Sequence, residues 1–177
     1  MSNRRTWDFW APRYTKLWVQ KWSLGPTRIA ITEAITNLTR SEAPLSILDM
    51  GCGIGQLLGD LKSRFPDRDL TLTGVDYSSE MIRQARERYP EIQFIESDVL
   101  DFNHPDRFDF ILVTHSFPYY DDQKNALSHL SQFLASEGHM LLANASSTTW
   151  YDKVFMKLIK LTTGHANYPS LNSMRSL

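Results

Sequence analysis

The chain has 177 residues, of which 42% are hydrophobic and 22% charged, and its formal net charge is −1. This length fits one domain of about 100 to 200 residues, and the hydrophobic content excludes an intrinsically disordered chain. No apolar run approaches the roughly 18 residues of a membrane-spanning helix, and the first residues lack the apolar stretch of a secretion signal, so we expect a cytoplasmic protein with no integral membrane segment.

The N-terminal segment, residues 1–40, combines an excess of Lys and Arg with most of the tryptophans. Basic and aromatic residues together can indicate a nucleic-acid or anionic membrane surface. The balanced overall charge argues against a nucleic-acid partner, and we favour an amphipathic helical cap whose tryptophans pack on the domain or line a ligand cavity. Within this cap, residues 26–38 are predicted as a helix with Ile31, Ile35 and Leu38 facing inward.

Residues 41–145 alternate short β-rich segments with helical ones. The expected strands are 46–50, 70–75, 92–95, 108–113 and 139–143. The fourth is a nearly continuous apolar run, which is typical of a strand covered on both faces of a parallel sheet. Strands that alternate with helices predict right-handed βαβ units, so the fold class is α/β with a doubly wound, Rossmann-like, mostly parallel sheet.

Two of the intervening helices have polar residues at their starts. Ser78 or Ser79 is predicted to cap the helix that follows the second strand, and Asp121 or Asp122 the helix that follows the fourth. Adjacent acids can also form a catalytic pair, but before a helical stripe they are more often a cap and a first-turn charge. The helix after Asp122 is expected to bury Leu127, Leu130, Phe133 and Leu134 and to end at Gly138.

A glycine-rich segment, residues 51–55, follows the first strand and is preceded by Asp49. A dinucleotide fingerprint would need a glycine where Gln56 stands, and a phosphate loop would need a Gly-Lys-Ser/Thr sequence, so a nicotinamide-linked oxidoreductase is disfavoured. Asp76 ends the second strand, where a carboxylate can accept hydrogen bonds from both hydroxyls of a ribose. The pattern therefore predicts a nucleoside ligand without a pyrophosphate.

Cys52 lies in this glycine-rich segment and is the only cysteine of the sequence. A single cysteine excludes an internal disulfide and a zinc site built on several thiolates. The histidines are dispersed along the chain, without the close spacing that zinc ligands show. We therefore expect no metal site.

Four ordered motifs resemble the class I S-adenosylmethionine-dependent methyltransferases, especially the small-molecule group that includes the ubiquinone and menaquinone methyltransferases. LDMGCGIG is similar to that family's first motif, GVDYSSEMI to the second and SDVLDF to the third, and FDFILVTHSFPYY with FLASEGHMLLA to its fourth and fifth strands. The resemblance covers residues 7–145. It implies S-adenosyl-L-methionine as cofactor, S-adenosyl-L-homocysteine as product and methyl transfer (EC 2.1.1) as reaction.

Carried over by position, the resemblance implies a cofactor site made of Tyr14, Asp49, Gly51, Cys52, Gly53, Gly55, Asp76, Tyr77, Asp98, Val99 and Thr114. The glycine loop, Thr114 and Asp49 would hold the methionine part, with Asp49 near its amino group and Tyr14 near its carboxylate. Asp76 would bind the ribose. Tyr77, Asp98 and the Val99 N–H would contact the adenine. For Asp76 and Asp98 the alternative is a cap or turn former after a strand.

Methyl transfer from a sulfonium is an in-line displacement, in which the protein mainly aligns the reactants and excludes water. A general base is needed only if the acceptor must lose a proton. His115, at the mouth of the fourth strand, is the candidate because imidazole titrates near neutral pH. The alternative is a histidine that shapes the cofactor pocket.

The acceptor is predicted from residues that follow the fourth strand. Ser116 to Tyr119 depart from the Asn/Asp-Pro-Pro-aromatic signature of amino methyltransferases, which argues against an exocyclic amine. Phe117, Tyr119, Tyr120 and the N-terminal tryptophans suggest a small apolar or aromatic acceptor. A methyltransferase-like protein that binds the cofactor with weak or no turnover is the alternative.

The segment 146–177 is expected to contain a helix at 150–161 and a tail, and to lack the C-terminal antiparallel hairpin of the family that the motifs resemble. The whole chain, residues 1–177, would then be one methyltransferase domain with the fifth strand at its edge. A bare apolar edge invites association. We expect the tail, the N-terminal segment or a second chain in a homodimer to cover it.

Overall fold

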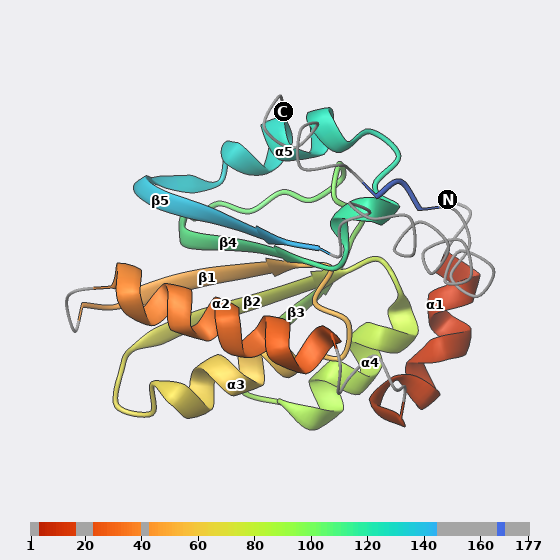
Figure 1. Ribbon diagram of the computed structural model, residues 1–177, viewed down its shortest axis with the longest axis horizontal. Coiled ribbons are helices and arrows are strands. Elements are labelled where there is room, and N and C mark those ends of the chain that lie inside the picture. The colour runs from red at the N-terminus through yellow and green to blue at the C-terminus, as the bar shows by residue number, and fades with distance from the viewer. Residues whose placement is uncertain (1–3, 17–22, 40–42, 145–165, 169–177) are drawn as a thin grey trace.

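The computed structural model describes residues 4–16, 23–39, 43–144 and 166–168. A five-stranded parallel sheet in the order β3-β2-β1-β4-β5 forms its centre (Figure 1). The strands are β1 (Leu45–Met50), β2 (Leu70–Asp76), β3 (Gln93–Glu96), β4 (Phe108–Thr114) and β5 (Leu134–Ala143). This arrangement confirms the predicted α/β fold. The strand order reverses between β1 and β4, and in such sheets ligands bind at the carboxyl ends beside this reversal.

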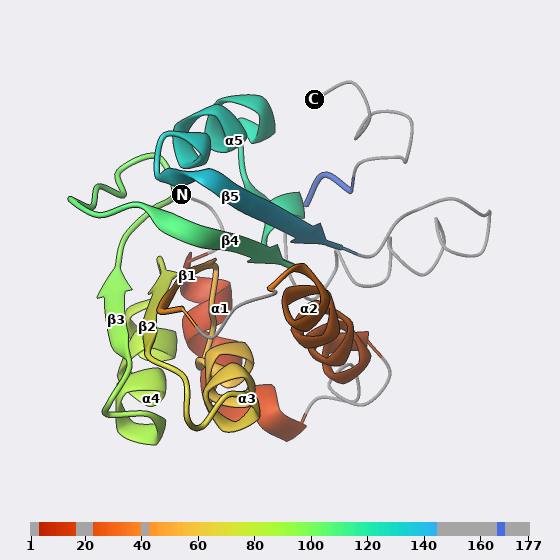
Figure 2. The same cartoon turned by 90° about the vertical axis from the view of Figure 1, so that its left-hand side faces the viewer.

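Helices cover both faces of the sheet (Figure 2). On one face lie α2 (Gly25–Leu38), α3 (Gln56–Arg64) and α4 (Ser79–Arg88), and on the other lies α5 (Gln123–Ser131). Near the carboxyl ends of the strands, α1 (Arg4–Trp10) packs beside α4 and continues into the short helix η1 (Ala11–Lys16). A further single turn, η3 (Phe117–Tyr119), follows β4.

Two hydrophobic clusters, one on each face, hold these layers together. Successive strand residues point to opposite faces, so Ile47 packs with α2, α3 and α4 while Leu48 packs with α5. Leu112 and Ile111 divide in the same way on β4. Coverage on both faces explains the continuous apolar run of β4.

Polar caps start two of the helices as the sequence predicts. The Ser78 hydroxyl accepts a hydrogen bond from the Met81 N–H at 3.2 Å, which caps α4. The Asp122 carboxylate accepts one from the Asn125 N–H at 3.0 Å, which caps α5. Asp122 therefore has the capping role that was favoured over a catalytic one.

Four positions differ from the prediction. Phe133 is buried as expected but follows α5, which ends at Ser131. Leu134 and Gly138 belong to β5, which begins before a register irregularity opposite Phe108 and Phe110. At Gly138 a Cβ atom would lie 2.8 Å from the Phe108 carbonyl oxygen, so the glycine permits a close approach of strands and does not end a helix. On α2, Ile31 and Ile35 are buried as expected, but Leu38 is 45% exposed in the last turn.

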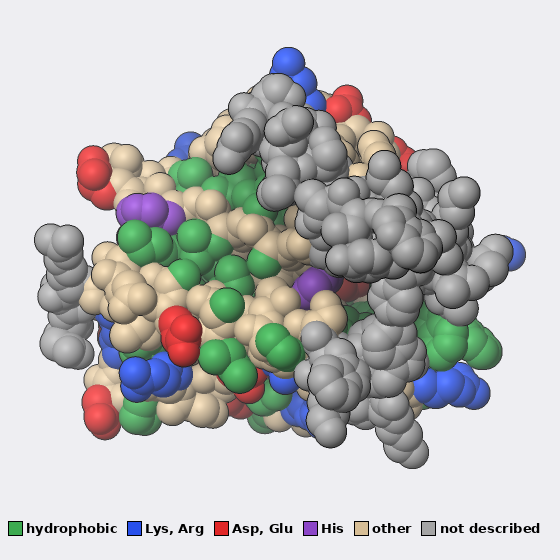
Figure 3. Space-filling model, in the orientation of Figure 1, with side chains coloured by type: hydrophobic (Ala, Val, Ile, Leu, Met, Phe, Trp, Pro, Cys, Tyr) green, Lys and Arg blue, Asp and Glu red, His purple; other side chains and the backbone are tan. Residues whose placement is uncertain are grey.

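β5 pairs with β4 and, among the described residues, with no other strand. Its side chains are half-buried or exposed, and Figure 3 shows hydrophobic side chains gathered over the β4–β5 side of the molecule. The predicted helix 150–161 and most of the tail lie outside the described residues. The expected lack of the C-terminal hairpin concerns the same segment and stays a prediction. The homodimer stays a prediction. Within the described segments, every helix is too short or too polar to cross a membrane.

Candidate functional site

A pocket opens at the carboxyl ends of β1 and β4, beside the reversal of strand order. It is lined by Tyr14, Leu24, Thr27, Arg28, Asp49, Gly51, Cys52, Gln56, Leu57, Thr114 and His115. Six of the predicted site residues meet there, namely Tyr14, Asp49, Gly51, Cys52, Thr114 and His115. Tyr14 reaches the pocket from η1, and Leu24, Thr27 and Arg28 come from the start of α2, so the N-terminal segment completes the wall.

The glycine loop between β1 and α3 has a backbone that only glycine adopts readily. Gly51, Gly53 and Gly55 have φ angles of +84°, +54° and +78°. At Gly51 a Cβ atom would also lie 2.2 Å from the Cβ of Ser116. The N–H groups of Gly51 and Cys52 both donate to the Val75 carbonyl, at 2.7 and 2.9 Å, which ties the loop to β2.

The loop after β4 is bound to the end of β1. The Ser116 hydroxyl donates to the Met50 carbonyl at 2.7 Å, and the Tyr120 hydroxyl donates to the same oxygen at 3.3 Å. Phe117 is 0% exposed and lies in the cluster beneath α5. The expectation that Phe117 faces an acceptor is therefore wrong, because its side chain fills the core. Tyr119 instead makes an edge contact with Trp7 of α1, with ring centroids 5.1 Å apart.

Asp76 joins the glycine loop to the turn before α4. Its Oδ2 accepts from the Gly53 N–H and its Oδ1 from the Ser78 N–H, each at 2.9 Å. Burial raises the pKa of Asp76 to about 6, although both N–H donors act to lower it; the nearby Asp8 carboxylate raises it further. A carboxylate has about four acceptor positions, so capacity remains for ribose hydroxyls.

Asp49 is a buried carboxylate of the pocket with one oxygen that is not hydrogen-bonded within the described part of the chain. The residue is 1% exposed, and among the described residues no group donates to its Oδ1. Burial, together with the charge of Asp76, raises its pKa to about 7. An unpaired buried carboxylate is costly, so a cationic donor in the pocket would relieve it.

Arg28 and Thr27 are pocket residues that the sequence did not single out. The Arg28 Nε donates to the Asp60 carboxylate at 2.7 Å, and its side chain is 23% exposed. Its guanidinium gives the pocket a cation opposite in sign to Asp49. In the sequence, Arg28 contributes to the positive charge of the N-terminal segment. Helical periodicity identifies only the apolar positions of α2, so it does not mark Arg28 as a site residue.

His115 stands at the end of β4 with a φ of +59°, an unusual angle for a residue other than glycine. Its backbone N–H donates to the Ala143 carbonyl at 2.8 Å, and its ring Nε2 lies 2.9 Å from the Thr27 hydroxyl. Burial lowers the pKa of the imidazole to about 4. The ring is therefore neutral at pH 7. The backbone of His115 is tied to β5, and its ring contacts α2 through Thr27.

The residues predicted to contact adenine lie outside the lining of this pocket, after the neighbouring strands β2 and β3. Burial raises the pKa of Tyr77, and its buried hydroxyl has no hydrogen-bond partner among the described residues. Val99 is buried in the cluster beneath α5. Asp98 is exposed and accepts from the Leu100 N–H at 3.1 Å, which is the turn-forming contact named as its alternative role. For Cys52, burial raises the pKa of the thiol, which is consistent with a small space-filling residue.

Comparison with known proteins gives a family for this fold and site. Residues 47–138 match the family model described as "Methyltransferase domain". The chain belongs to the methyltransferase-domain family. The match spans the sheet from β1 into β5 and contains Asp49, the glycine loop, Asp76 and His115, so most of the pocket lies in the family region, while Tyr14 and Arg28 precede it.

Curated relatives agree with this family, and a solved structure agrees with the fold. The chain is 32% identical over 121 residues to trans-aconitate 2-methyltransferase of Enterobacter sp. (strain 638), covering 68% of this chain and 47% of the relative. It is 29% identical over 115 residues to malonyl-[acyl-carrier protein] O-methyltransferase 1 of Ilyobacter polytropus, covering 63% and 42%. The chain thus spans about half the length of these relatives. The plantazolicin methyltransferase BpumL has the same fold, with a TM-score of 0.71 at 24% identity over 89% of this chain and 64% of that one.

Proposed function

We propose that the protein is an S-adenosylmethionine-dependent methyltransferase (EC 2.1.1) acting on a small-molecule acceptor. The proposal rests on the buried Oδ1 of Asp49 beside the glycine loop, for which the described residues supply no hydrogen-bond partner. A ligand with an ammonium group would satisfy this oxygen. At Gly53 a Cβ atom would meet only the Tyr14 ring, at 3.8 Å, so the missing side chain lets a ligand approach the backbone there. The residues present therefore fit the methionine end of the cofactor.

Most of the predicted residues, together with Arg28, have a role in this proposal. Asp49 and Arg28 would bind the ammonium and carboxylate groups of the methionine part, with Tyr14 and Thr114 beside it. Asp76 would accept from the ribose hydroxyls, since it keeps free acceptor positions. Tyr77, Asp98 and the Val99 N–H would contact the adenine. When bound, the cofactor supplies an activated methyl group, and the pocket residues orient it and exclude water.

The proposed acceptor is small, with an apolar or aromatic body, because Trp7, Tyr14 and Tyr119 form a connected aromatic group next to the pocket. Both curated relatives are named for acceptors with carboxyl groups, trans-aconitate and a malonyl group. A carboxylate is already ionised at neutral pH and needs no base. With such an acceptor His115 would shape the pocket. With a protonated acceptor its neutral imidazole would be the base, and a weak one, because burial lowers its pKa to about 4.

Cofactor binding by the purified protein tests the proposal directly. We expect S-adenosylhomocysteine to raise the thermal unfolding midpoint and NAD to leave it unchanged. Asp76→Ala should weaken S-adenosylhomocysteine binding by about 1.5 to 3 kcal/mol, measured by calorimetry, because it removes a buried charged acceptor. A shift with NAD alone contradicts the proposal, and unchanged affinity in Asp76→Ala removes that residue from the site.

Turnover is tested separately with S-adenosylmethionine and a panel of small carboxylic acids and aromatic alcohols, including trans-aconitate. We expect formation of S-adenosylhomocysteine that depends on an acceptor. Binding of S-adenosylhomocysteine without methyl transfer to any member of the panel would instead favour a cofactor-binding protein.

A further inference from the structure

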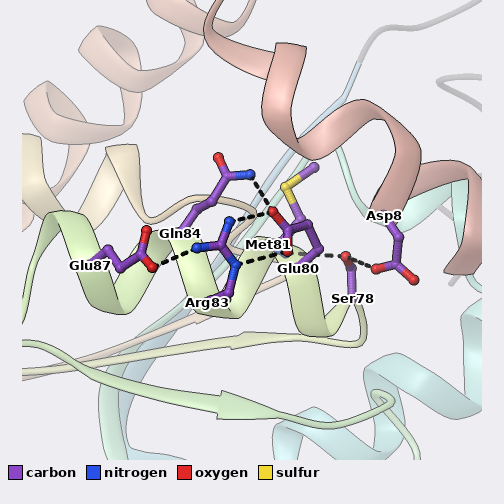
Figure 4. A network of polar contacts seen from close by, with 7 residues as sticks. All are labelled: Asp8, Ser78, Glu80, Met81, Arg83, Gln84 and Glu87. Atoms are coloured by element: carbon purple, nitrogen blue, oxygen red, sulfur yellow. Dashed lines mark hydrogen bonds and ion pairs between the residues drawn. The ribbon is translucent and has the colours of Figure 1, made fainter.

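A chain of hydrogen bonds leads from the N-terminal helix toward the candidate cofactor site, and Figure 4 shows its first contact, between Asp8 and Ser78. The Ser78 hydroxyl donates to the Asp8 carboxylate at 2.5 Å, and the Ser78 N–H donates to Oδ1 of Asp76 at 2.9 Å. The second oxygen of Asp76 accepts from the Gly53 N–H at 2.9 Å. Asp8 of α1, the turn before α4 and the glycine loop are therefore joined through three consecutive hydrogen bonds.

Ser78 connects these contacts because its hydroxyl both donates and accepts a hydrogen bond. The residue is 0% exposed, and the hydroxyl accepts from the Met81 N–H at 3.2 Å while its single proton goes to Asp8. A hydroxyl has one proton to donate. Asp8 is thus the acceptor that fixes the rotamer in which Ser78 caps α4. Without Asp8 this buried donor loses its partner.

The segment that Asp8 anchors also forms part of the pocket wall. η1 follows α1 directly and brings Tyr14 to the pocket. Ala11, Trp7 and Tyr14 pack against Ile54 of the glycine loop and Met81 of α4. The position of α1 therefore determines where Tyr14 stands relative to the glycine loop.

We propose that Asp8 is a positioning residue for the cofactor site: through Ser78 it fixes α1 and Tyr14 against the turn that holds Asp76. This role rests on the proposed cofactor site and assigns to it a residue that does not touch the ligand. Asp8 acts by keeping two sides of the site, the Tyr14 side and the Asp76 side, in one arrangement before the ligand binds. Preorganisation of this kind raises affinity by lowering the cost of ordering the site.

The α1 helix offers a matched control. Arg4, one turn before Asp8, forms an ion pair with Glu96, and both side chains are about half exposed. This contact also ties α1 to the domain, but it lies on the surface and outside the hydrogen-bond chain. Arg4→Gln loosens α1 without removing a partner of Ser78, so it separates general attachment of the helix from the role of Asp8.

The test measures S-adenosylhomocysteine affinity by calorimetry on the full chain. We expect Asp8→Ala to raise the dissociation constant about tenfold, equivalent to about 1.4 kcal/mol. Asp8→Asn keeps an oxygen that accepts from Ser78, so it should stay within about twofold of wild type, as should Arg4→Gln. Equal effects of Asp8→Ala and Arg4→Gln, or failure of Asp8→Asn to restore affinity, would overturn the proposal.

A double-mutant cycle with Ser78→Ala isolates the contact from losses of folding stability. Ser78→Ala removes the cap of α4 and the partner of Asp8, so adding Asp8→Ala should weaken binding no further. Additive effects would overturn the role of Asp8. Wild-type protein that fails to bind S-adenosylhomocysteine overturns both the proposed function and this inference, whereas binding by wild type with unchanged affinity in Asp8→Ala overturns the inference alone.

Discussion

The middle of the sheet is stabilised by apolar packing, whereas its carboxyl edge, where the strands end, carries a buried charge and backbone strain. In the middle, Ile47 and Ile111 are 0% exposed and surrounded by apolar side chains. A few residues further along the same strands, Asp49 is buried without a partner for one oxygen among the described residues, and His115 has a positive φ. The apolar core therefore supplies the stability that offsets an unfavourable free energy at the carboxyl edge. Unsatisfied charge and backbone strain gathered in one place are typical of a ligand site.

Gly51→Ala should have the largest effect on this edge. The new Cβ atom would lie 2.2 Å from the Ser116 Cβ, at a φ of +84°. Overpacking and backbone strain together should lower the free energy of unfolding by about 3 kcal/mol, measured by urea denaturation.

The companion variant separates the two causes. Ser116→Gly in the Gly51→Ala background removes the clash and leaves the strain of the positive φ. It should therefore recover part of the lost stability, despite losing the hydrogen bond to the Met50 carbonyl. A Gly51→Ala protein as stable as wild type would contradict the close packing of the glycine loop against the loop after β4.

The core and the edge also differ in how far the sequence predicts them. The strands, both caps and the parallel sheet follow from local patterns, such as the apolar run of β4 and the serine before Met81. The glycine loop is equally local, so its position at the pocket was predictable. The motif order placed Asp49, Asp76 and His115 at the strand ends, where the structure has them.

Contacts between distant segments could not be predicted in this way. Asp8 and Ser78 are 70 residues apart, and no periodicity connects them. Gly138 resembles a helix C-cap in sequence, but its small size serves the close approach to the Phe108 carbonyl in a β irregularity. Leu38 keeps the helical spacing of Ile31 and Ile35, and only the tertiary structure leaves the last turn of α2 exposed.

Asp49→Asn should have an intermediate effect, with opposite signs for stability and binding. At pH 8 and without ligand, the free energy of unfolding of the variant should be about 1 to 2 kcal/mol higher than that of wild type, because an amide removes a buried charge. Its affinity for S-adenosylhomocysteine should fall, since the ammonium group loses its proposed acceptor. Thermal unfolding and calorimetry on the same samples measure both quantities.

The effect of Asp49→Asn on stability should depend on pH, because the pKa of Asp49 is raised in the folded state. Burial raises the pKa of Asp49 from 3.8 to about 7, so between about pH 4 and 7 the folded state binds more protons than the unfolded state. Stability from this group therefore falls as pH rises through that window. The stability advantage of Asp49→Asn should grow from pH 4 to pH 8, and wild-type affinity should rise over the same range. A constant advantage would show that Asp49 stays ionised throughout.

The smallest effect on stability is expected at Leu38, which lies at the outer boundary of the hydrophobic core. Leu38 is 45% exposed, whereas Ile35, one turn earlier on α2, is 0% exposed. Leu38→Ala should change the free energy of unfolding by less than about 0.5 kcal/mol, while the control Ile35→Ala should lower it by about 2 to 5 kcal/mol. Because α2 also supplies Thr27 and Arg28 to the pocket, Ile35→Ala should weaken S-adenosylhomocysteine binding through its loss of packing, and Leu38→Ala should leave binding unchanged. A large loss of stability in Leu38→Ala would mean that this turn of α2 is covered in solution, and the core would then extend past the boundary that separates it from the carboxyl edge.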